Sequence, residues 1–275
     1  MGRNRNTQGL SRFKFAGTRG ENRMDKKKYW REETIRFVIS PTYYVYIIAI
    51  VLTVLLKILP GFLEAFDSAQ PGVFATEAAR FFASEIGMIL MYVPAFAVSA
   101  ACIRDKEQRK RYGKVLREEL PGRDAAVIRM VTMIIWLYLP LPIAAVGSDA
   151  VIASKCGSAF FGMSLMLSVI WLLPTLIFMT GFAGALTEWT GNCLPGIIGS
   201  IVVWVFTQGS TADFNDYFSC VAIRHASSAE VVAFEAVDIN TAALTINRIV
   251  VAALGFLFIF IAVKGCEFRK NGKKA

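Results

Sequence analysis

Residues 159–180 read AFFGMSLMLSVIWLLPTLIFMT, a run without any charged side chain. A helix that crosses a bilayer needs about 20 predominantly apolar residues, so this stretch predicts a membrane span. Five more uncharged runs flank it, at residues 43–56, 86–103, 130–147, 193–208 and 249–263. The chain therefore predicts an all-α polytopic membrane protein with six spans. With Lys57, Arg248 and Lys264 snorkelling to the interfaces, the spans are expected at about 41–59, 84–103, 127–147, 158–180, 192–208 and 245–264.

Basic residues gather in three segments. Of the 30 Lys and Arg residues, 11 precede residue 37, 9 lie from Arg104 to Arg129, and 5 lie from Lys264 to the end. Six spans place all three segments on one side of the membrane, and the positive-inside rule makes that side the cytoplasm. Both termini are therefore expected to be cytoplasmic.

Composition restricts the function. The net charge of +9 lies beside membrane spans, where it attracts anionic headgroups, so no nucleic-acid partner is expected. The five cysteines lack metal-ligand spacing, and His225 is the single histidine, so we expect no metal site. Cys156 and Cys220 both fall in predicted external segments and are either bridged or two free thiols. No phosphate-binding loop occurs, so the chain is not expected to hydrolyse ATP by itself.

The domain organisation is simple. Residues 1–23 form a polar extension that is expected to be poorly ordered, and Met24 is an alternative start. Residues 24–270 form one transmembrane domain, and 271–275 form a basic tail. No cleaved signal peptide is expected.

The segment DKKKYWREETIRFVIS, residues 25–40, precedes the first span. Trp30, Ile35 and Phe37 lie among basic residues at loosely helical spacing, which predicts an amphipathic helix in the inner interface, ended by Pro41. A solvated basic lead-in is the alternative.

The connecting segments differ in character. Residues 60–80 and 147–157 are predicted external loops, and 209–247 predicts short helices on or dipping into the outer leaflet. The internal segment RDKEQRKRYGKVLREE, residues 104–119, predicts a short cytoplasmic helix before Pro121 and Gly122. The four glycines of the fourth and fifth spans predict close helix packing, namely Gly181, Gly184, Gly196 and Gly199.

Ionisable groups are missing from the span centres, which disfavours a proton- or sodium-driven mechanism. Lys57, Glu85 and Arg248 lie near outer ends, where an interfacial or snorkelling role is expected. Glu118, Glu119 and Arg123 spell EExxxR, which resembles a motif of intramembrane proteases. Because those enzymes need histidines within their helices, we interpret the match as chance, and we expect no catalytic residues.

Three stretches resemble the ABC-2 type permease family, the membrane subunits of type V ABC exporters. The first is ETIRFVISPTYYVYIIAIVL, with Ser40, Pro41 and Tyr44 as matching positions. The second is RDKEQRKRYGKVLREELPGRDAAVIRMV, with matches at Glu107, Gly113, Leu116, Leu120, Pro121, Arg123 and Val127. The third is FEAVDINTAALTINRIVVAALGFLFIFIAVKGCEFRK, with matches at Phe234, Asp238, Ile239, Asn247 and Arg248.

The resemblance implies a permease in a bacterial cytoplasmic membrane, paired with a second copy or a related chain and docked on separate ABC ATPase subunits. ATP and Mg would bind those ATPases, and no cofactor would bind this chain. Contact with the ATPase is implied for the first cytoplasmic loop, at Asp105, Glu107, Arg111, Tyr112, Gly113, Val115, Leu116, Glu118, Glu119, Pro121 and Arg123. The interfacial helix would couple this loop to the first span.

The resemblance implies a substrate path at the dimer interface, where the family uses faces of the second and fifth spans. The residues there are Met88, Met91, Tyr92, Phe96, Ser99, Ile197, Ser200, Val203 and Phe206, which suit an amphipathic, lipid-like or peptidic substrate. The alternative function is a non-transport assembly factor or sensor, whose basic loops bind partners and membrane lipids.

Overall fold

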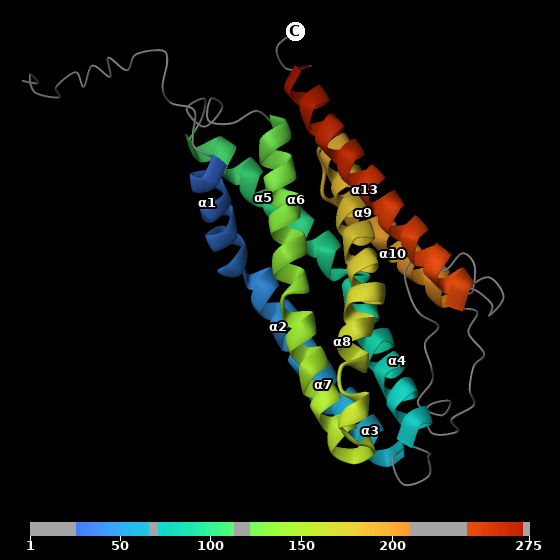
Figure 1. The fold of residues 1–275 in the computed structure, drawn as a ribbon. Helices are drawn as coiled ribbons and strands as arrows, with labels where there is room; N and C mark the ends of the chain where they lie inside the picture. Colours follow the sequence, from blue (N-terminus) through green and yellow to red (C-terminus); the bar gives the residue numbers. More distant parts are fainter. Residues whose placement is uncertain (1–25, 66–70, 113–121, 210–240, 272–275) are drawn as a thin grey trace, which may run out of the picture.

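The computed structural model describes residues 26–65, 71–112, 122–209 and 241–271, and nearly all of this part is helical, without strands (Figure 1). In chain order the elements are α1 (Lys26–Val38), α2 (Pro41–Thr53), the π-helix η1 (Val54–Ile58), α3 (Leu59–Ala65), α4 (Pro71–Leu90), α5 (Val93–Tyr112), α6 (Gly122–Tyr138), α7 (Pro140–Cys156), the 3₁₀ turn η4 (Ser158–Phe160), α8 (Met163–Leu167), the π-helix η5 (Ser168–Leu172), α9 (Leu173–Thr190), α10 (Leu194–Gly209) and α13 (Thr241–Asn271). The predicted all-α fold is confirmed for these residues.

Five helical runs in the described ranges are long and apolar enough to cross a membrane. They are Pro41–Leu63, Pro71–Arg104, Arg123–Cys156, Ser158–Thr190 and Thr245–Phe268. The predicted fifth span forms α10, whose apolar part, Leu194–Phe206, is shorter than the about 20 residues of an ordinary span. The protein is thus a helical membrane protein with five candidate spans, and a sixth crossing stays a prediction.

Proline residues divide the long runs. Helix α4 ends at Leu90 and α5 starts at Val93, immediately before Pro94. Pro140 begins α7 two residues after the end of α6, and Pro174 lies in the first turn of α9, directly after the π-helix η5. Because proline lacks an N–H and its ring meets the preceding turn, these positions interrupt the helical hydrogen bonds without ending the run.

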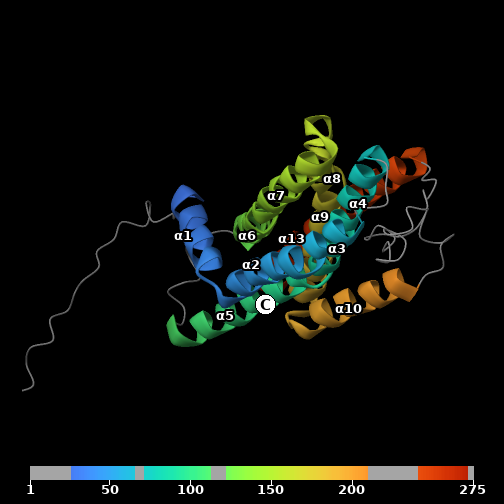
Figure 2. The same ribbon diagram turned by 90° about the horizontal axis from the view of Figure 1, so that it is seen from below.

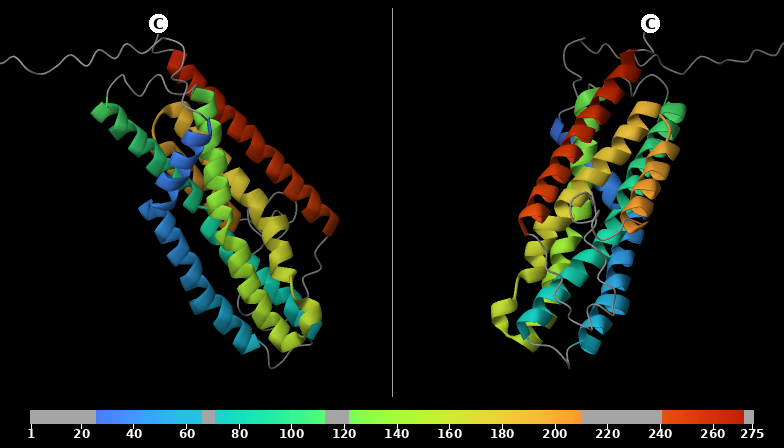
Figure 3. Two further views of the ribbon diagram at one scale, coloured as in Figure 1. Left: turned by 60° about the vertical axis from the view of Figure 1, so that its left-hand side comes forward. Right: turned by 90° about the vertical axis from the view of Figure 1, so that its right-hand side faces the viewer.

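Helix α9 packs against α13, α10, α5 and α6, and α13 runs alongside it for much of its length (Figure 3). A Cβ atom on Gly181 would lie 2.5 Å from the carbonyl oxygen of Gly255, so these two helices approach at their backbones. A Cβ atom on Gly196 would lie 3.0 Å from the carbonyl oxygen of Ala183. Gly184 and Gly199 instead make room for side chains of Met130, Phe182 and Leu186. The predicted close packing at these glycines is confirmed.

The other half of the molecule is built around α2, α4 and α7. Its core includes the fully buried side chains of Phe62, Phe82 and Leu141. The Tyr46 hydroxyl is also buried and donates a hydrogen bond to the Leu137 carbonyl, with 2.5 Å between the oxygens. In the view from below, α7 and α10 lie on opposite sides of the bundle (Figure 2).

The outer surface of α2 is apolar. Exposed side chains of α2 and of the following η1 form a helical stripe, at Tyr44, Val45, Ile48, Val51, Leu52, Leu55 and Leu56. An exposed apolar surface of this extent is typical of contact with lipid or with another membrane helix. The structure therefore supports the membrane assignment independently of hydropathy.

The helices extend beyond three predicted loop boundaries. Most of the external loop predicted at 60–80 is helical, because α3 continues to Ala65 and α4 begins at Pro71. The loop predicted at 147–157 belongs mostly to α7. On the basic side, α5 runs without a break from Val93 to Tyr112, so the first half of the predicted separate cytoplasmic helix is an extension of the second span. The remainder, 113–121, and the predicted outer-leaflet helices within 210–240 lie outside the described residues.

Helix α1 and the C-terminal end of α13 lie at the same end of the bundle, at the top of Figure 1. The end of α5 and the start of α6 lie there too. This arrangement brings the described parts of the three basic segments together. The assignment of that end to the cytoplasm stays a prediction.

Candidate functional site

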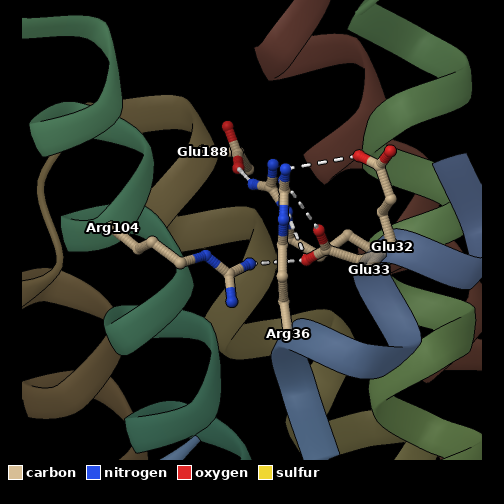
Figure 4. A network of polar contacts seen from close by, with 6 residues as sticks. Glu32, Glu33, Arg36, Arg104 and Glu188 are labelled. Atoms are coloured by element: carbon tan, nitrogen blue, oxygen red, sulfur yellow. Dashed lines mark hydrogen bonds and ion pairs between the residues drawn. The ribbon is translucent and has the colours of Figure 1, made fainter. Parts of the chain in front are cut away.

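Glu33 is a buried carboxylate on α1, with only 3% of its surface exposed. Its Oε1 atom lies 2.7 Å from Nη2 of Arg104 on α5 and 3.8 Å from Nε of Arg129 on α6. Its Oε2 atom lies 3.9 Å from Nη1 of Arg36, one turn further along α1. Figure 4 shows Arg36, from the same helix as Glu33, and Arg104, from α5, both directed at Glu33. One carboxylate thus holds three helices together.

Arg129 extends this network to a fourth helix. Its Nη1 atom lies 3.3 Å from Oε1 of Glu188, near the end of α9. Arg36 also contacts Glu32, at 3.4 Å between Nη2 and Oε2. We call these six residues the basic-end network, namely Glu32, Glu33, Arg36, Arg104, Arg129 and Glu188.

A separate ion pair joins α1 to α6. Nζ of Lys26 lies 2.9 Å from Oδ2 of Asp124, and the lysine side chain is mostly exposed. Exposed pairs contribute about 0–1 kcal/mol, so this contact adds little by itself. It nevertheless gives α1 a second ion pair with α6, at its first residue, besides the one at Glu33.

The charges of the network balance, with three arginines and three glutamates. Burial of a carboxylate is costly unless oppositely charged groups compensate it, and three guanidinium groups within 4 Å do so for Glu33. In a partly buried site, removing one member of such a network leaves an opposite charge without compensation, which is costly. Movement of α1 or α5 would therefore disturb contacts on α6 and α9.

The helix predicted within 25–40 is present as α1, and its place in the inner interface stays a prediction. The three apolar residues named for it do not share one face. Trp30 and Ile35 are exposed, whereas Phe37 is buried and lies 5.6 Å from the Tyr43 ring, between centroids. The face directed at the bundle carries Glu33 and Phe37, one turn apart. This helix therefore binds the bundle through a charge and an aromatic ring.

Most of the predicted ATPase-coupling residues fall outside the described side chains. The backbone of Asp105, Glu107, Arg111 and Tyr112 belongs to α5. Arg123 is exposed at the start of α6. Gly113, Val115, Leu116, Glu118, Glu119 and Pro121 lie outside the described residues, as does His225.

The predicted substrate-path residues divide by exposure. Met91, Ser99 and Ser200 are buried, and Met88, Ile197 and Val203 are half-buried. Tyr92, Phe96 and Phe206 are exposed. Met91 and Val203 pack in one apolar cluster that also contains Phe178, Met179 and Val251. Helix α5 contacts α10 within the chain, and the substrate path itself stays a prediction.

The snorkelling role predicted for Arg248 is wrong. Arg248 is 5% exposed, and its Nη1 atom donates to Oγ1 of Thr175 on α9 at 3.3 Å. Thr175 and the neighbouring Asn247 are buried too, so the guanidinium faces polar groups inside the bundle. Sequence position near a span end did not reveal this, because only the rotation of α13 decides which way the side chain points.

Two further ionisable groups are more buried than the sequence indicates. Glu85 is buried and its Oε2 atom lies 2.9 Å from Nζ of Lys57, whose own side chain is largely exposed. Asp149 has no exposed surface, and its two carboxylate oxygens accept the backbone N–H groups of Ser164 and Leu165, at 2.8 and 3.0 Å. Asp149 on α7 thus caps the first turn of α8.

One feature of the sequence marks Arg129 and Glu188 as residues of interest, although it does not reveal the rest of the network. Glu188 is the single charge in the turn after the fourth span, and Arg129 lies at the edge of an apolar run. A lone acid and a lone base at the same predicted depth indicate a pair. Glu33 gave a weaker signal, because it lies among several other charged residues of α1.

Among the described residues, no group of three or more His, Cys, Asp or Glu side chains is arranged to hold a metal ion. In comparisons with known proteins, no protein-family model matches this chain, and neither a curated protein nor a solved structure matches it. The ABC-2 resemblance therefore rests on the residues quoted above.

Proposed function

We propose that this chain is the permease subunit of an ATP-driven ABC-2 type exporter in a cytoplasmic membrane. A separate ABC ATPase supplies the energy, and a second permease subunit completes the membrane part. The substrate class is amphipathic, either lipid-like or peptidic. This chain binds no nucleotide and performs no catalysis of its own.

The observation that carries this proposal is the contact of Glu33 with Arg104. Arg104 lies on α5, which continues as one helix to Tyr112 and so carries the start of the basic loop rigidly. A force on that loop would reach Arg104, then Glu33 on α1, and through Arg129 the end of α9. An exporter driven by a cytoplasmic ATPase needs such a connection between loop and bundle.

A second observation concerns the substrate class. Met91, between α4 and α5, packs in one apolar cluster with Val203 of α10, and Ser99 of α5 and Ser200 of α10 are buried. Apolar side chains with a few polar groups suit an amphipathic molecule better than a bare ion.

The test is purification of the tagged chain from its native membrane in mild detergent, with mass spectrometry and an ATPase assay of the eluate. Wild type is expected to bring down an ABC ATPase. A loop variant with Glu107, Val115 and Leu116 all changed to alanine is expected to lose it. The variant Glu33→Gln is expected to retain the ATPase but to change its hydrolysis rate several-fold, because docking survives while the connection to the bundle is cut.

The matched control is Glu267→Gln on α13. Glu267 pairs with Lys264 at 3.3 Å at the same end of the bundle, but both side chains are substantially exposed and neither joins the network. This control is expected to behave as wild type in recovery and in rate. If no ATPase is recovered with wild type in several detergents, the exporter proposal fails and the assembly or sensor role becomes the one to pursue.

A further inference from the structure

A groove of about 280 Å³ lies where α1 turns into α2, against α5. Two guanidinium groups and two hydroxyl groups line it, from Arg36, Arg104, Ser40 and Thr42. The apolar part of its lining consists of Phe37, Pro41, Ala97, Ala100 and Ala101. Its volume is close to the lower limit of about 300 Å³ for small-molecule sites, which suits a headgroup rather than a large ligand.

The charges that line the groove are positive. Glu32 and Glu33 contact the same arginines but do not line it. Helix α1 contributes five basic and two acidic residues, so the surroundings also favour an anion.

Arg104 has donors to spare. Its Nη2 atom bonds to Glu33, and 26% of its side-chain surface stays exposed, although its Nε atom is buried and lies out of reach of a ligand in the groove. A guanidinium carries five N–H groups, and its fork matches two oxygens of a phosphate. The structure thus offers an incompletely used arginine beside a second one from another helix.

Exposed apolar side chains lie close in sequence to the groove residues on α2 and α5. Pro41 begins the first candidate span and Arg104 ends the second, so the groove lies at the expected level of the headgroups. Tyr44 and Val45 follow Ser40 and Pro41 by one helical turn, Phe96 precedes Ala100 by one turn, and all three are exposed, as is Ile48. Acyl chains attached to a phosphate in the groove could lie along these side chains, which a free phosphate would not use.

From these observations we propose that the groove binds the phosphate headgroup of an anionic membrane lipid. Arg36 and Arg104 hold the phosphate, Ser40 and Thr42 bond to it or to the glycerol oxygens, and the alanines of α5 leave room for the glycerol. The proposal does not depend on the exporter function, because the site lies wholly within this chain.

The test is native mass spectrometry of the purified full chain with phosphatidylglycerol and with phosphatidylcholine of the same acyl chains. Wild type is expected to retain phosphatidylglycerol at least tenfold better. The variant Ala100→Leu is expected to abolish this preference, because its larger side chain fills the groove and leaves every ion pair in place. Arg36→Gln is expected to weaken it at least fivefold.

The matched control is Arg31→Gln. Arg31 is an exposed arginine of α1 that does not line the groove, so this variant is expected to keep the preference within twofold. Helical content by circular dichroism identifies any variant that has not folded. If Arg36→Gln fails this check, the result with Ala100→Leu alone decides the test.

Three outcomes would overturn the proposal. One is equal retention of the two lipids by wild type. Another is an unchanged preference in Ala100→Leu. The third is displacement of phosphatidylglycerol by millimolar inorganic phosphate, which would show that the groove takes a free anion and makes no use of the acyl chains.

Discussion

At the scale of single residues, the charge of Glu33 matters more than that of its neighbour Glu32, because Glu33 balances the charges of three nearby arginines. Within the described ranges Glu32 forms an ion pair with Arg36 alone, and both of those side chains are about one-third exposed. The two adjacent glutamates therefore form a natural comparison between a buried and a solvent-accessible ion pair.

Glu33→Gln is expected to destabilise the protein by about 3 kcal/mol, because Arg104 and Arg129 would lose their shared carboxylate in a partly buried site. Glu32→Gln is expected to cost less than about 1 kcal/mol, as is usual for accessible pairs. The measurement is the thermal unfolding midpoint of both variants in one detergent. Equal shifts for the two variants would contradict the assigned role of Glu33.

Asp149 offers a second prediction for a single residue. Asp149→Ala removes the acceptor of two backbone N–H groups at the start of α8, so a loss of about 1–2 kcal/mol is expected. Asp149→Asn keeps one carbonyl oxygen and should lose less. Unfolding midpoints that rank wild type, Asn and Ala in this order would support the capping role, and identical midpoints would refute it.

At the scale of elements, the contact of α9 with α13 depends on the absence of a side chain. Phe178 and Gly181 of α9 lie against Gly255 of α13 at backbone distance. Small residues permit such approach between membrane helices, where van der Waals packing supplies much of the association energy.

Gly181→Ala is expected to separate these helices and to destabilise the protein by about 1–3 kcal/mol, since the new Cβ atom would collide with the Gly255 carbonyl oxygen. Gly147→Ala on α7 is the control, because a Cβ atom there would meet nothing within 4 Å. It is expected to be neutral or slightly stabilising, as alanine favours helix. Unfolding midpoints and the monodisperse fraction in size-exclusion chromatography test both, and a neutral Gly181→Ala would disprove the tight contact.

At the scale of the whole molecule, the number of crossings depends on α10. This helix has 16 residues and therefore a length of about 24 Å, compared with about 30 Å for the hydrocarbon core. If α10 crosses the membrane as a sixth span, α13 ends on the side that carries α1. Figure 1 shows α1 and the end of α13 at the same end of the bundle.

Native cysteines can report this topology. Cys156 ends α7 at the end of the bundle opposite α1, and Cys266 lies near the end of α13. In single-cysteine variants, a membrane-impermeant maleimide is expected to label Cys156 in intact cells and to label Cys266 only after permeabilisation. Labelling of Cys266 in intact cells would show that the bundle crosses five times and that its termini lie on opposite sides.

The sequence alone determined the class of protein and the approximate place of its helices. Runs such as 159–180 carry no charge over a bilayer's thickness, and hydropathy needs no knowledge of neighbouring helices. The glycines that permit close packing were also predictable, because a residue without a side chain allows a neighbouring helix to approach closely whichever helix that is. The ends of the helices were not, since Glu85 and Asp149 have partners on other elements that only folding provides.

Only the tertiary structure decided which charges act together. Glu33, Arg104, Arg129 and Glu188 come from four helices far apart in the chain, and each reads by itself as an ordinary interfacial charge. The direction of Arg248 and the groove between α1, α2 and α5 depend in the same way on how the helices are rotated about their axes. Hydropathy averages over a helix and carries no information on that rotation, which packing against neighbouring helices sets.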